Sequence, residues 1–268
     1  MLDCWGRDIH YLRISVTDRC NLRCRYCMPA GGVSLKRHEQ ILSYENIAKV
    51  AEAAANLGVW KIRLTGGEPL VRRGVVDLVK RLREIQGIRE ISMTTNGVLL
   101  HRYANDLKAA GLDRLNISID SLDPERYHWL TRIGNLDEAL RGVEAAREAG
   151  FRNTKINMVL MEETTGYEVE QLAEFCRQRD MRLQRIHYYR LEDHHTIPPG
   201  HEAERPLPCN SCNRIRMTAD GYLKPCLFSD TRIPLDWNSL ETSILRAIKE
   251  KPASGTACRS MENWQIGG

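Results

Sequence analysis

The sequence lacks an apolar run of about 18 residues, the length that marks a candidate membrane-spanning helix. The first residues also lack the apolar segment of a secretory signal. Neither sign of charge dominates, because 39 Lys and Arg residues stand against 35 Asp and Glu and leave a net charge of +4. So small an excess gives no reason to expect a nucleic-acid or membrane partner. We therefore expect a cytoplasmic protein.

The chain has nine cysteines, and in a cytoplasmic protein they indicate metal ligation rather than disulfides. Three of them, Cys20, Cys24 and Cys27, lie within eight residues. A set of sulfur ligands favours an iron–sulfur cluster or zinc. Because no fourth cysteine adjoins the triplet, the pattern favours a four-iron cluster with one iron left open. A structural zinc site or a redox disulfide is the alternative.

A second triplet lies near the C-terminus, at Cys209, Cys212 and Cys226. The dipeptide Asp220-Gly221, between two short alternating runs, predicts a β-hairpin. Such a hairpin returns the third cysteine towards the first two. The result is a second three-thiolate site with an open iron, or alternatively a zinc site completed by Cys258 or a histidine.

Between the triplets, strand-like and helix-like segments alternate six times. The expected strands are 11–17, 60–64, 90–95, 114–119, 154–160 and 182–189. This alternation predicts an α/β fold with a parallel sheet and outer helices. Six units are fewer than the eight of a closed barrel, so we expect a partial (β/α)6 TIM-like barrel over residues 1–192. A linker rich in His and Pro then leads into a small cluster-binding domain, 193–268.

Two motifs resemble those of radical S-adenosylmethionine (SAM) enzymes: the first triplet with its Tyr26, and the run Gly66-Gly67-Glu68-Pro69. The segments 15–29 and 209–228 narrow the resemblance to the GTP 3′,8-cyclase family, whose members also end in two glycines. The resemblance implies a radical SAM lyase that converts GTP to 3′,8-cyclo-7,8-dihydro-GTP, in the first step of molybdenum cofactor biosynthesis. It also implies the partial-barrel fold, two [4Fe–4S] clusters and SAM.

Matching positions imply roles for individual residues. The residues expected to bind the clusters are Cys20, Cys24, Cys27, Cys209, Cys212 and Cys226. Those expected to bind SAM are Tyr26, Gly67, Glu68 and Ser118. Those expected to bind GTP are Arg13, Arg63, Thr94, Lys155, Arg214 and Arg216. Arg13 and the terminal pair Gly267 and Gly268 are the expected catalytic residues.

The family also implies a reductant of the flavodoxin or ferredoxin type and a monomer or homodimer. The chain departs from the family pattern at Gln184, His187 and Tyr189, where an Arg, an acidic residue and a Met are usual, and its segment before Cys209 is short. If Cys258 closed the second cluster, GTP could not bind that iron. Two alternatives stay open: a related radical SAM enzyme that modifies a peptide or another small substrate, and an iron–sulfur or zinc scaffold that binds a partner.

Overall fold

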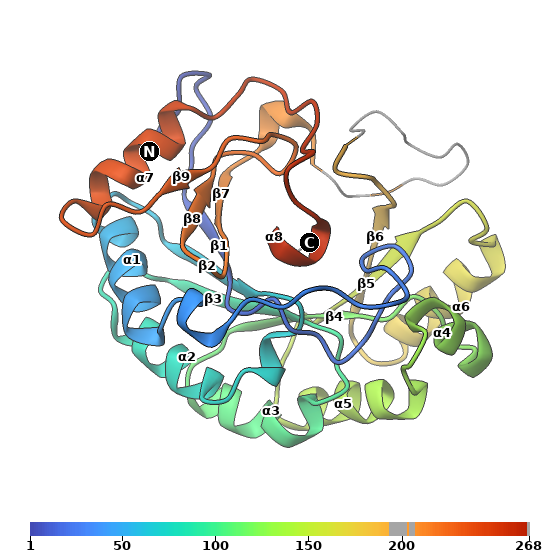
Figure 1. The fold of residues 1–268 in the computed structure, drawn as a ribbon. Helices are drawn as coiled ribbons and strands as arrows, with labels where there is room; N and C mark the ends of the chain where they lie inside the picture. Colours follow the sequence, from blue (N-terminus) through green and yellow to red (C-terminus); the bar gives the residue numbers. More distant parts are fainter. Residues whose placement is uncertain (193–202, 204–206, 267–268) are drawn as a thin grey trace.

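The computed structural model describes residues 1–192, 203 and 207–266, and it is built around one nine-stranded sheet (Figure 1). Six parallel strands lie side by side in chain order, so the predicted partial barrel is confirmed. They are β1 (Tyr11–Ser15), β2 (Lys61–Thr65), β3 (Glu90–Thr95), β4 (Arg114–Ser118), β5 (Lys155–Leu160) and β6 (Arg182–His187).

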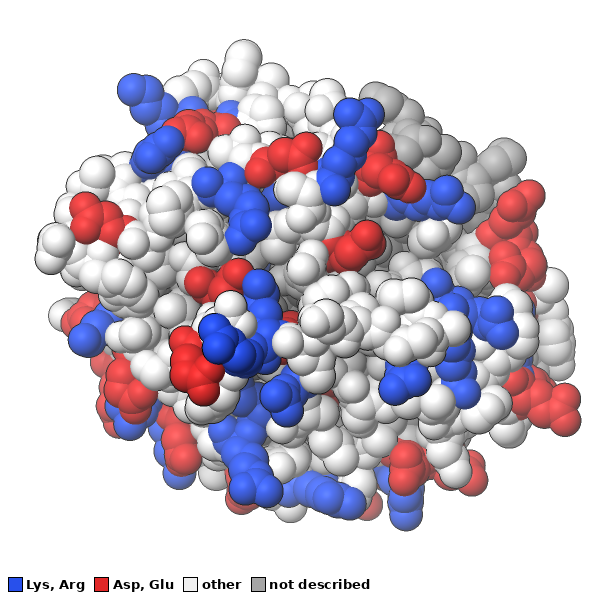
Figure 2. All heavy atoms as spheres, in the orientation of Figure 1, with Lys and Arg blue, Asp and Glu red and all other residues white. Residues whose placement is uncertain are grey.

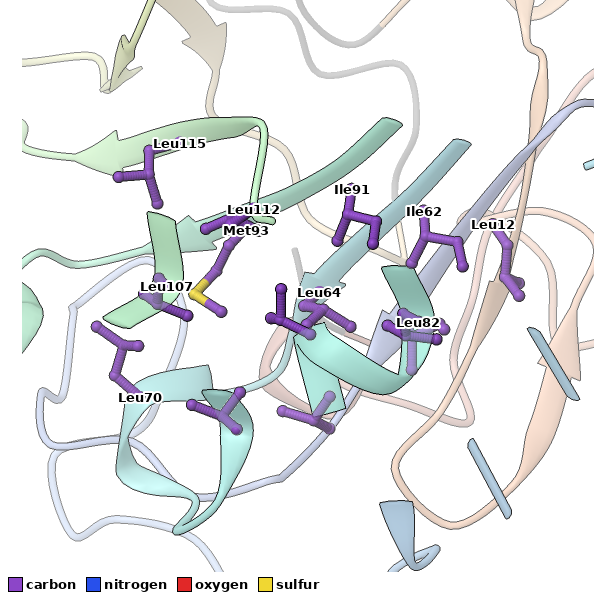
Figure 3. Packing of buried hydrophobic residues seen from close by; sticks show 14 of the residues in the cluster. Leu12, Ile62, Leu64, Leu70, Leu82, Ile91, Met93, Leu107, Leu112 and Leu115 are labelled. Atoms are coloured by element: carbon purple, nitrogen blue, oxygen red, sulfur yellow. The ribbon is translucent and has the colours of Figure 1, made fainter. Parts of the chain in front are cut away.

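Helices cover the outer face of this sheet (Figure 1). Apolar residues at alternate strand positions point towards the helices, as Leu12, Ile62, Leu64 and Ile91 do in Figure 3, and all four are fully buried. The outer helices are α1 (Tyr44–Asn56), α2 (Val75–Glu84), α3 (Leu100–Ala109), α4 (Pro124–Thr131), α5 (Leu136–Glu148) and α6 (Gly166–Arg177). Because side chains alternate along a strand, the positions between the apolar residues face the interior of the barrel.

The C-terminal segment continues the same sheet. The strand β7 (Arg214–Met217) pairs in parallel with β1, and β8 (Tyr222–Lys224) and β9 (Ile233–Pro234) follow in antiparallel. Gly221 has a φ of 84° between β7 and β8, which confirms the hairpin turn. A separate domain starting at residue 193 stays a prediction.

Two further helices, α7 (Leu240–Lys249) and α8 (Asn263–Ile266), complete the described chain. The last of them lies at the mouth of the barrel, far in sequence from the strands around it (Figure 1). No helix in the described ranges is both long enough and apolar enough to span a membrane.

Candidate active site

The first cysteine triplet lies in the loop that follows β1. The amides of Cys27 and Met28 both donate to the carbonyl of Cys24 at 2.9 Å, which folds the loop into a tight turn. Two more loop amides, those of Arg23 and Arg25, donate to the carbonyls of Thr131 and Leu130 at the end of α4. The three thiols thereby line a cavity at the C-terminal end of the parallel strands, which we call the first cavity.

The three thiols of the first cavity are half-buried. Burial raises the pKa of Cys20 to about 11 and that of Cys27 to about 12, and it raises the pKa of Cys24 well above its ordinary value. Thiolates at this site therefore need positive charge from a bound group, and the irons of a cluster supply it. Within the described ranges, no three His, Cys, Asp or Glu side chains are arranged to hold a single metal ion.

The glycine pair after β2 sits directly against the loop that precedes the triplet. A Cβ atom on Gly67 would lie 2.3 Å from the carbonyl oxygen of Arg19, and one on Gly66 would lie 2.7 Å from that of Thr17. The amides of Gly67 and Glu68 donate to these same two carbonyls at 2.8 Å. The close approach that requires glycine is thus between two backbone segments, and it fixes the cysteine loop on the sheet.

The carboxylate of Glu68 is fully buried in the first cavity wall. It accepts hydrogen bonds from the amides of Leu70 and Asn96 and from the hydroxyl of Thr95, at 2.7 to 3.0 Å. Burial raises the pKa of Glu68 to about 7 in spite of these three donors. A ligand cation in the first cavity would therefore favour the charged form of this group.

Tyr26 attaches the cysteine loop to the segment that follows β4. Its hydroxyl donates to the carboxylate of Asp120 at 2.7 Å, and the amide of Val159 donates to the same carboxylate at 2.8 Å. Burial raises the pKa of Asp120 to about 6. Ser118, at the end of β4, lines the same cavity, so all four residues predicted to bind SAM lie around the first cavity with the thiols.

The second triplet lines an adjoining cavity inside the barrel, the second cavity, whose walls are strongly cationic. Arg13 on β1 lies in register with Arg63 on β2 and with Arg216 on β7. Two residues earlier on the same strands, Tyr11 lies in register with Lys61 and Arg214. Among the described residues, eight cationic side chains and one carboxylate line this cavity; they are Arg13, Lys61, Arg63, Arg114, Lys155, Arg214, Arg216, Lys251 and Glu90.

The electrostatics of the second cavity reflect this crowding. The pKa of Arg13 is well below its ordinary value because the side chain is buried and Arg216 lies beside it. Burial alone would raise the pKa of Tyr11, yet Arg63, Arg13 and other nearby cations lower it. The single carboxylate, Glu90, already pairs with Lys61 at 2.8 Å. The cavity thus carries a positive charge that an anionic ligand would neutralise.

The second triplet shares this positive environment. Burial would raise the pKa of Cys212, but the charge of Lys251 and a hydrogen bond from the backbone of Arg214 lower it. The ammonium of Lys251 is held by the carbonyls of Arg214 at 2.9 Å and Pro225 at 2.8 Å. Sequence reasoning did not identify Lys251 or Lys61. The alternation of β2 would have found Lys61, two positions before Arg63, whereas Lys251 reaches the site only through the packing of the C-terminal segment.

The two cavities share a wall formed by Thr94, Asn157, Ile186 and Tyr189. Each cysteine triplet therefore opens into one of two adjoining cavities. A molecule in the second cavity would lie next to one in the first.

The comparisons with known proteins agree with this geometry. Residues 14–176 match the Radical SAM superfamily. A protein of Moorella thermoacetica named GTP 3′,8-cyclase is 40% identical over the whole of both chains. Another of that name, from Petrotoga mobilis, is 41% identical over 87% of this chain and 85% of its own. The chain belongs to the GTP 3′,8-cyclase family of radical SAM enzymes.

As a radical SAM family member, the chain is an enzyme that uses SAM and an iron–sulfur cluster. The crystal structure of Streptococcus suis SuiB has the same fold, with a TM-score of 0.70 at 16% identity over 92% of this chain and 67% of that one. The alignment with the Moorella GTP 3′,8-cyclase extends over 330 residues although this chain has 268, so the relative contains insertions.

Three positions that differ from the family pattern lie in the cavity walls. Gln184 accepts a hydrogen bond from the ammonium of Lys155 at 3.1 Å and donates to the side chain of Asn157 at 2.9 Å. His187 lines the first cavity, and Tyr189 lies in the shared wall. Gln184 is therefore a neutral group that orients a neighbouring cation.

Cys258 lies outside the linings of both cavities. It is buried with its sulfur 3.5 Å from the ammonium of Lys224, and its amide donates to the carbonyl of Leu191. Gly267 and Gly268 lie outside the described residues. The helix before them places Asn263 and Trp264 in the lining of the first cavity.

Proposed function

We propose that this enzyme converts GTP to 3′,8-cyclo-7,8-dihydro-GTP, the first step of molybdenum cofactor biosynthesis, in the cytoplasm. The observation that carries the proposal is the cationic second cavity, which shares a wall with the cavity of the first triplet. A triphosphate is the kind of ligand that eight cations and one carboxylate accommodate. The relatives at about 40% identity are named for this reaction.

Each triplet is assigned one [4Fe–4S] cluster. Cys20, Cys24 and Cys27 would hold the first, with SAM beside it against Tyr26, Gly67, Glu68 and Ser118; Cys209, Cys212 and Cys226 would hold the second, next to GTP. When bound, SAM and the first cluster would supply the radical chemistry that removes a hydrogen atom from C3′ of the ribose. A flavodoxin or ferredoxin would serve as reductant, and the enzyme would act as a monomer or homodimer.

The chain's own residues position the substrate. Arg13, Arg63 and Arg216 form one row across three neighbouring strands, so they can contact successive phosphate oxygens. Lys155, held by Gln184, approaches from the opposite side of the barrel. Thr94 accepts a hydrogen bond from Arg63 at 3.2 Å in the wall common to both cavities. These contacts would hold the ribose at that wall, next to the first cavity.

The terminal residues Gly267 and Gly268 are assigned a catalytic role with Arg13. The described part of the chain supports this only by bringing α8 to the mouth of the barrel. Two residues without side chains can enter a narrow space and place a carboxylate near arginines. Deleting both residues should leave SAM binding intact and abolish the conversion of GTP.

The decisive experiment uses GTP labelled with deuterium at C3′. Reconstituted enzyme is incubated without oxygen with SAM, dithionite and the labelled nucleotide, and the products are examined by mass spectrometry and NMR. We expect deuterium in 5′-deoxyadenosine and a new bond between C3′ and C8. Cleavage of SAM without deuterium transfer would contradict the proposal and favour an enzyme that acts on a peptide or another small substrate.

Iron analysis tests the two-cluster assignment separately. The reconstituted enzyme should contain about eight irons, and a Cys226→Ala variant about four. Cys176→Ala is the matched control, because this cysteine is buried on α6 outside both triplets, and it should keep the full content. An iron content of about four in the unchanged enzyme would refute the second cluster.

A further inference from the structure

The outer face of the first cysteine loop carries an exposed tryptophan between two arginines. Trp129 on α4 is 38% exposed. The guanidinium carbon of Arg25 lies 4.1 Å from the centre of its ring, and that of Arg126 lies 4.6 Å away. Since Arg25 stands between Cys24 and Cys27, this stack lies directly over the loop that holds the thiols. With Arg23 and Arg132 it forms what we call the arginine–tryptophan surface.

Within the described parts of the chain, three of the four arginines of this surface have no carboxylate partner. Arg23 and Arg25 each donate to a single backbone carbonyl, that of Ala30 and that of Trp129. Arg132 donates to the carbonyls of Arg23 and Met28. Only Arg126 has a carboxylate partner, Glu168. Lys and Arg side chains also gather over the region where the cysteine loop meets α4 (Figure 2).

The surface is held in place by hydrogen bonds between the loop and α4. The amides of Arg23 and Arg25 donate to carbonyls at the end of α4. Arg132, which follows α4 with a φ of 66°, donates in turn to the carbonyl of Arg23 in the loop. A partner that binds here therefore meets a preformed face and needs no rearrangement of the chain. Arg and Trp are also the residues that dominate binding energy at protein interfaces.

The inner side of the same loop faces the first cavity, where SAM is assigned. An electron donor cannot approach the first cluster through that occupied cavity, so its access lies on the outer face. We propose that the arginine–tryptophan surface docks the acidic face of a small one-electron donor protein. This inference rests on the proposed placing of a cluster at the first triplet. The donor's flavin or metal centre loses one electron, the first cluster gains it, and no bond is formed or broken between the two proteins.

Charge reversal at the surface tests the proposal, with a flavodoxin as the probe. The double variant Arg23→Glu, Arg25→Glu should bind flavodoxin at least about tenfold more weakly, because rim charges steer acidic partners to such a surface. Binding is measured by titration calorimetry at low salt, and the affinity of the unchanged enzyme should fall as salt is added. The rate at which reduced flavodoxin reduces the cluster should fall in parallel.

Two control variants separate docking from structural damage. Arg179 lies 4.0 Å over the ring of Phe175 at the end of α6, so Arg179→Glu reverses a similar stack elsewhere on the surface and should leave flavodoxin binding unchanged. Arg25→Lys keeps the charge but loses the guanidinium bond to Trp129, and it should bind flavodoxin like the unchanged enzyme.

Dithionite separates the docking proposal from the proposed function. Being small, it needs no docking face, so SAM cleavage driven by dithionite should be the same in all variants. An unchanged flavodoxin affinity in the double variant, an equal loss in Arg179→Glu, or an equal loss of dithionite-driven cleavage would each overturn the proposal. Binding and cluster reduction are measured without GTP, so a failure to convert GTP would not affect this result.

Discussion

Replacing Arg13 by glutamine should have opposite effects on stability and on nucleotide affinity. Arg13 lies in register between Arg63 and Arg216, and its pKa is well below the ordinary value because of burial and of this neighbouring charge. Two unit charges about 6 Å apart at an effective dielectric constant of about 20 repel by roughly 3 kcal/mol. Water in the cavity screens part of this repulsion. We therefore expect Arg13→Gln to raise the free energy of unfolding of the nucleotide-free enzyme by about 1 to 3 kcal/mol.

The same substitution should weaken GTP binding. A hydrogen bond to a charged group contributes about 1.5 to 3 kcal/mol, which corresponds to a roughly 10- to 150-fold change in Kd. Thermal unfolding with and without GTP measures both effects. The Tm without nucleotide should rise by roughly 2 to 8 °C, and the further increase caused by GTP should shrink.

Arg141→Gln on the outer helix α5 is the matched control, because this side chain is exposed and lines neither cavity. It should change neither quantity. A fall in the Tm of Arg13→Gln with unchanged GTP affinity would refute the reasoning, since it would show that Arg13 stabilises the barrel rather than binds the substrate.

Three further predictions concern the cavity walls. Gly67→Ala should lower the free energy of unfolding by about 3 kcal/mol or more because its Cβ would overlap backbone, whereas Gly166→Ala, with open space around it, should have little effect in the same denaturant titration. Burial raises the pKa of Glu68 to about 7, so the unfolded chain loses this proton at a lower pH than the folded protein does. The free energy of unfolding of the cofactor-free protein should therefore fall by up to about 3 kcal/mol as the pH rises from about 4.5 to 7. Glu68→Gln should remove most of this pH dependence. Gln184→Ala should raise the KM for GTP with little change in kcat, because Gln184 holds the ammonium of Lys155. The same substitution should have no further effect on KM in a Lys155→Ala variant. Additive effects of the two substitutions would contradict positioning through that lysine.

Local patterns were sufficient to predict the barrel. Strand-like and helix-like segments alternate along the chain, and helices begin after capping residues such as Ser43 and Asp123, whose side chains accept hydrogen bonds from the first turns of α1 and α4. Each of these signals operates over a few residues. The same is true of the cysteine spacings and of Asp220-Gly221 at the hairpin.

The parts that could not be predicted depend on contacts between distant segments. The amine of Lys251 reaches the carbonyl of Arg214, 37 residues away, and no local pattern marks it as a cavity residue. The pairing of β7 with β1 joins segments 203 residues apart, and it brings Arg216 beside Arg13. The three donors around Glu68 come from its own turn and from the end of β3, so its raised pKa also emerges only from the folded structure.

The pairing of β7 with β1 connects the two halves of the proposed mechanism. It places the arginines of the C-terminal segment in the same rows as those of the barrel, so that one polyanion can contact both segments at once. The same segment carries the second triplet, so the pairing of β7 with β1 also sets the position of these cysteines in the cavity wall. In the absence of an anion these neighbouring arginines repel each other, and burial together with the neighbouring positive charge lowers the pKa of Arg13 and of Arg216. A bound triphosphate would remove this repulsion and tighten the contact between β1 and β7, so substrate binding itself would complete the site in which the second triplet acts.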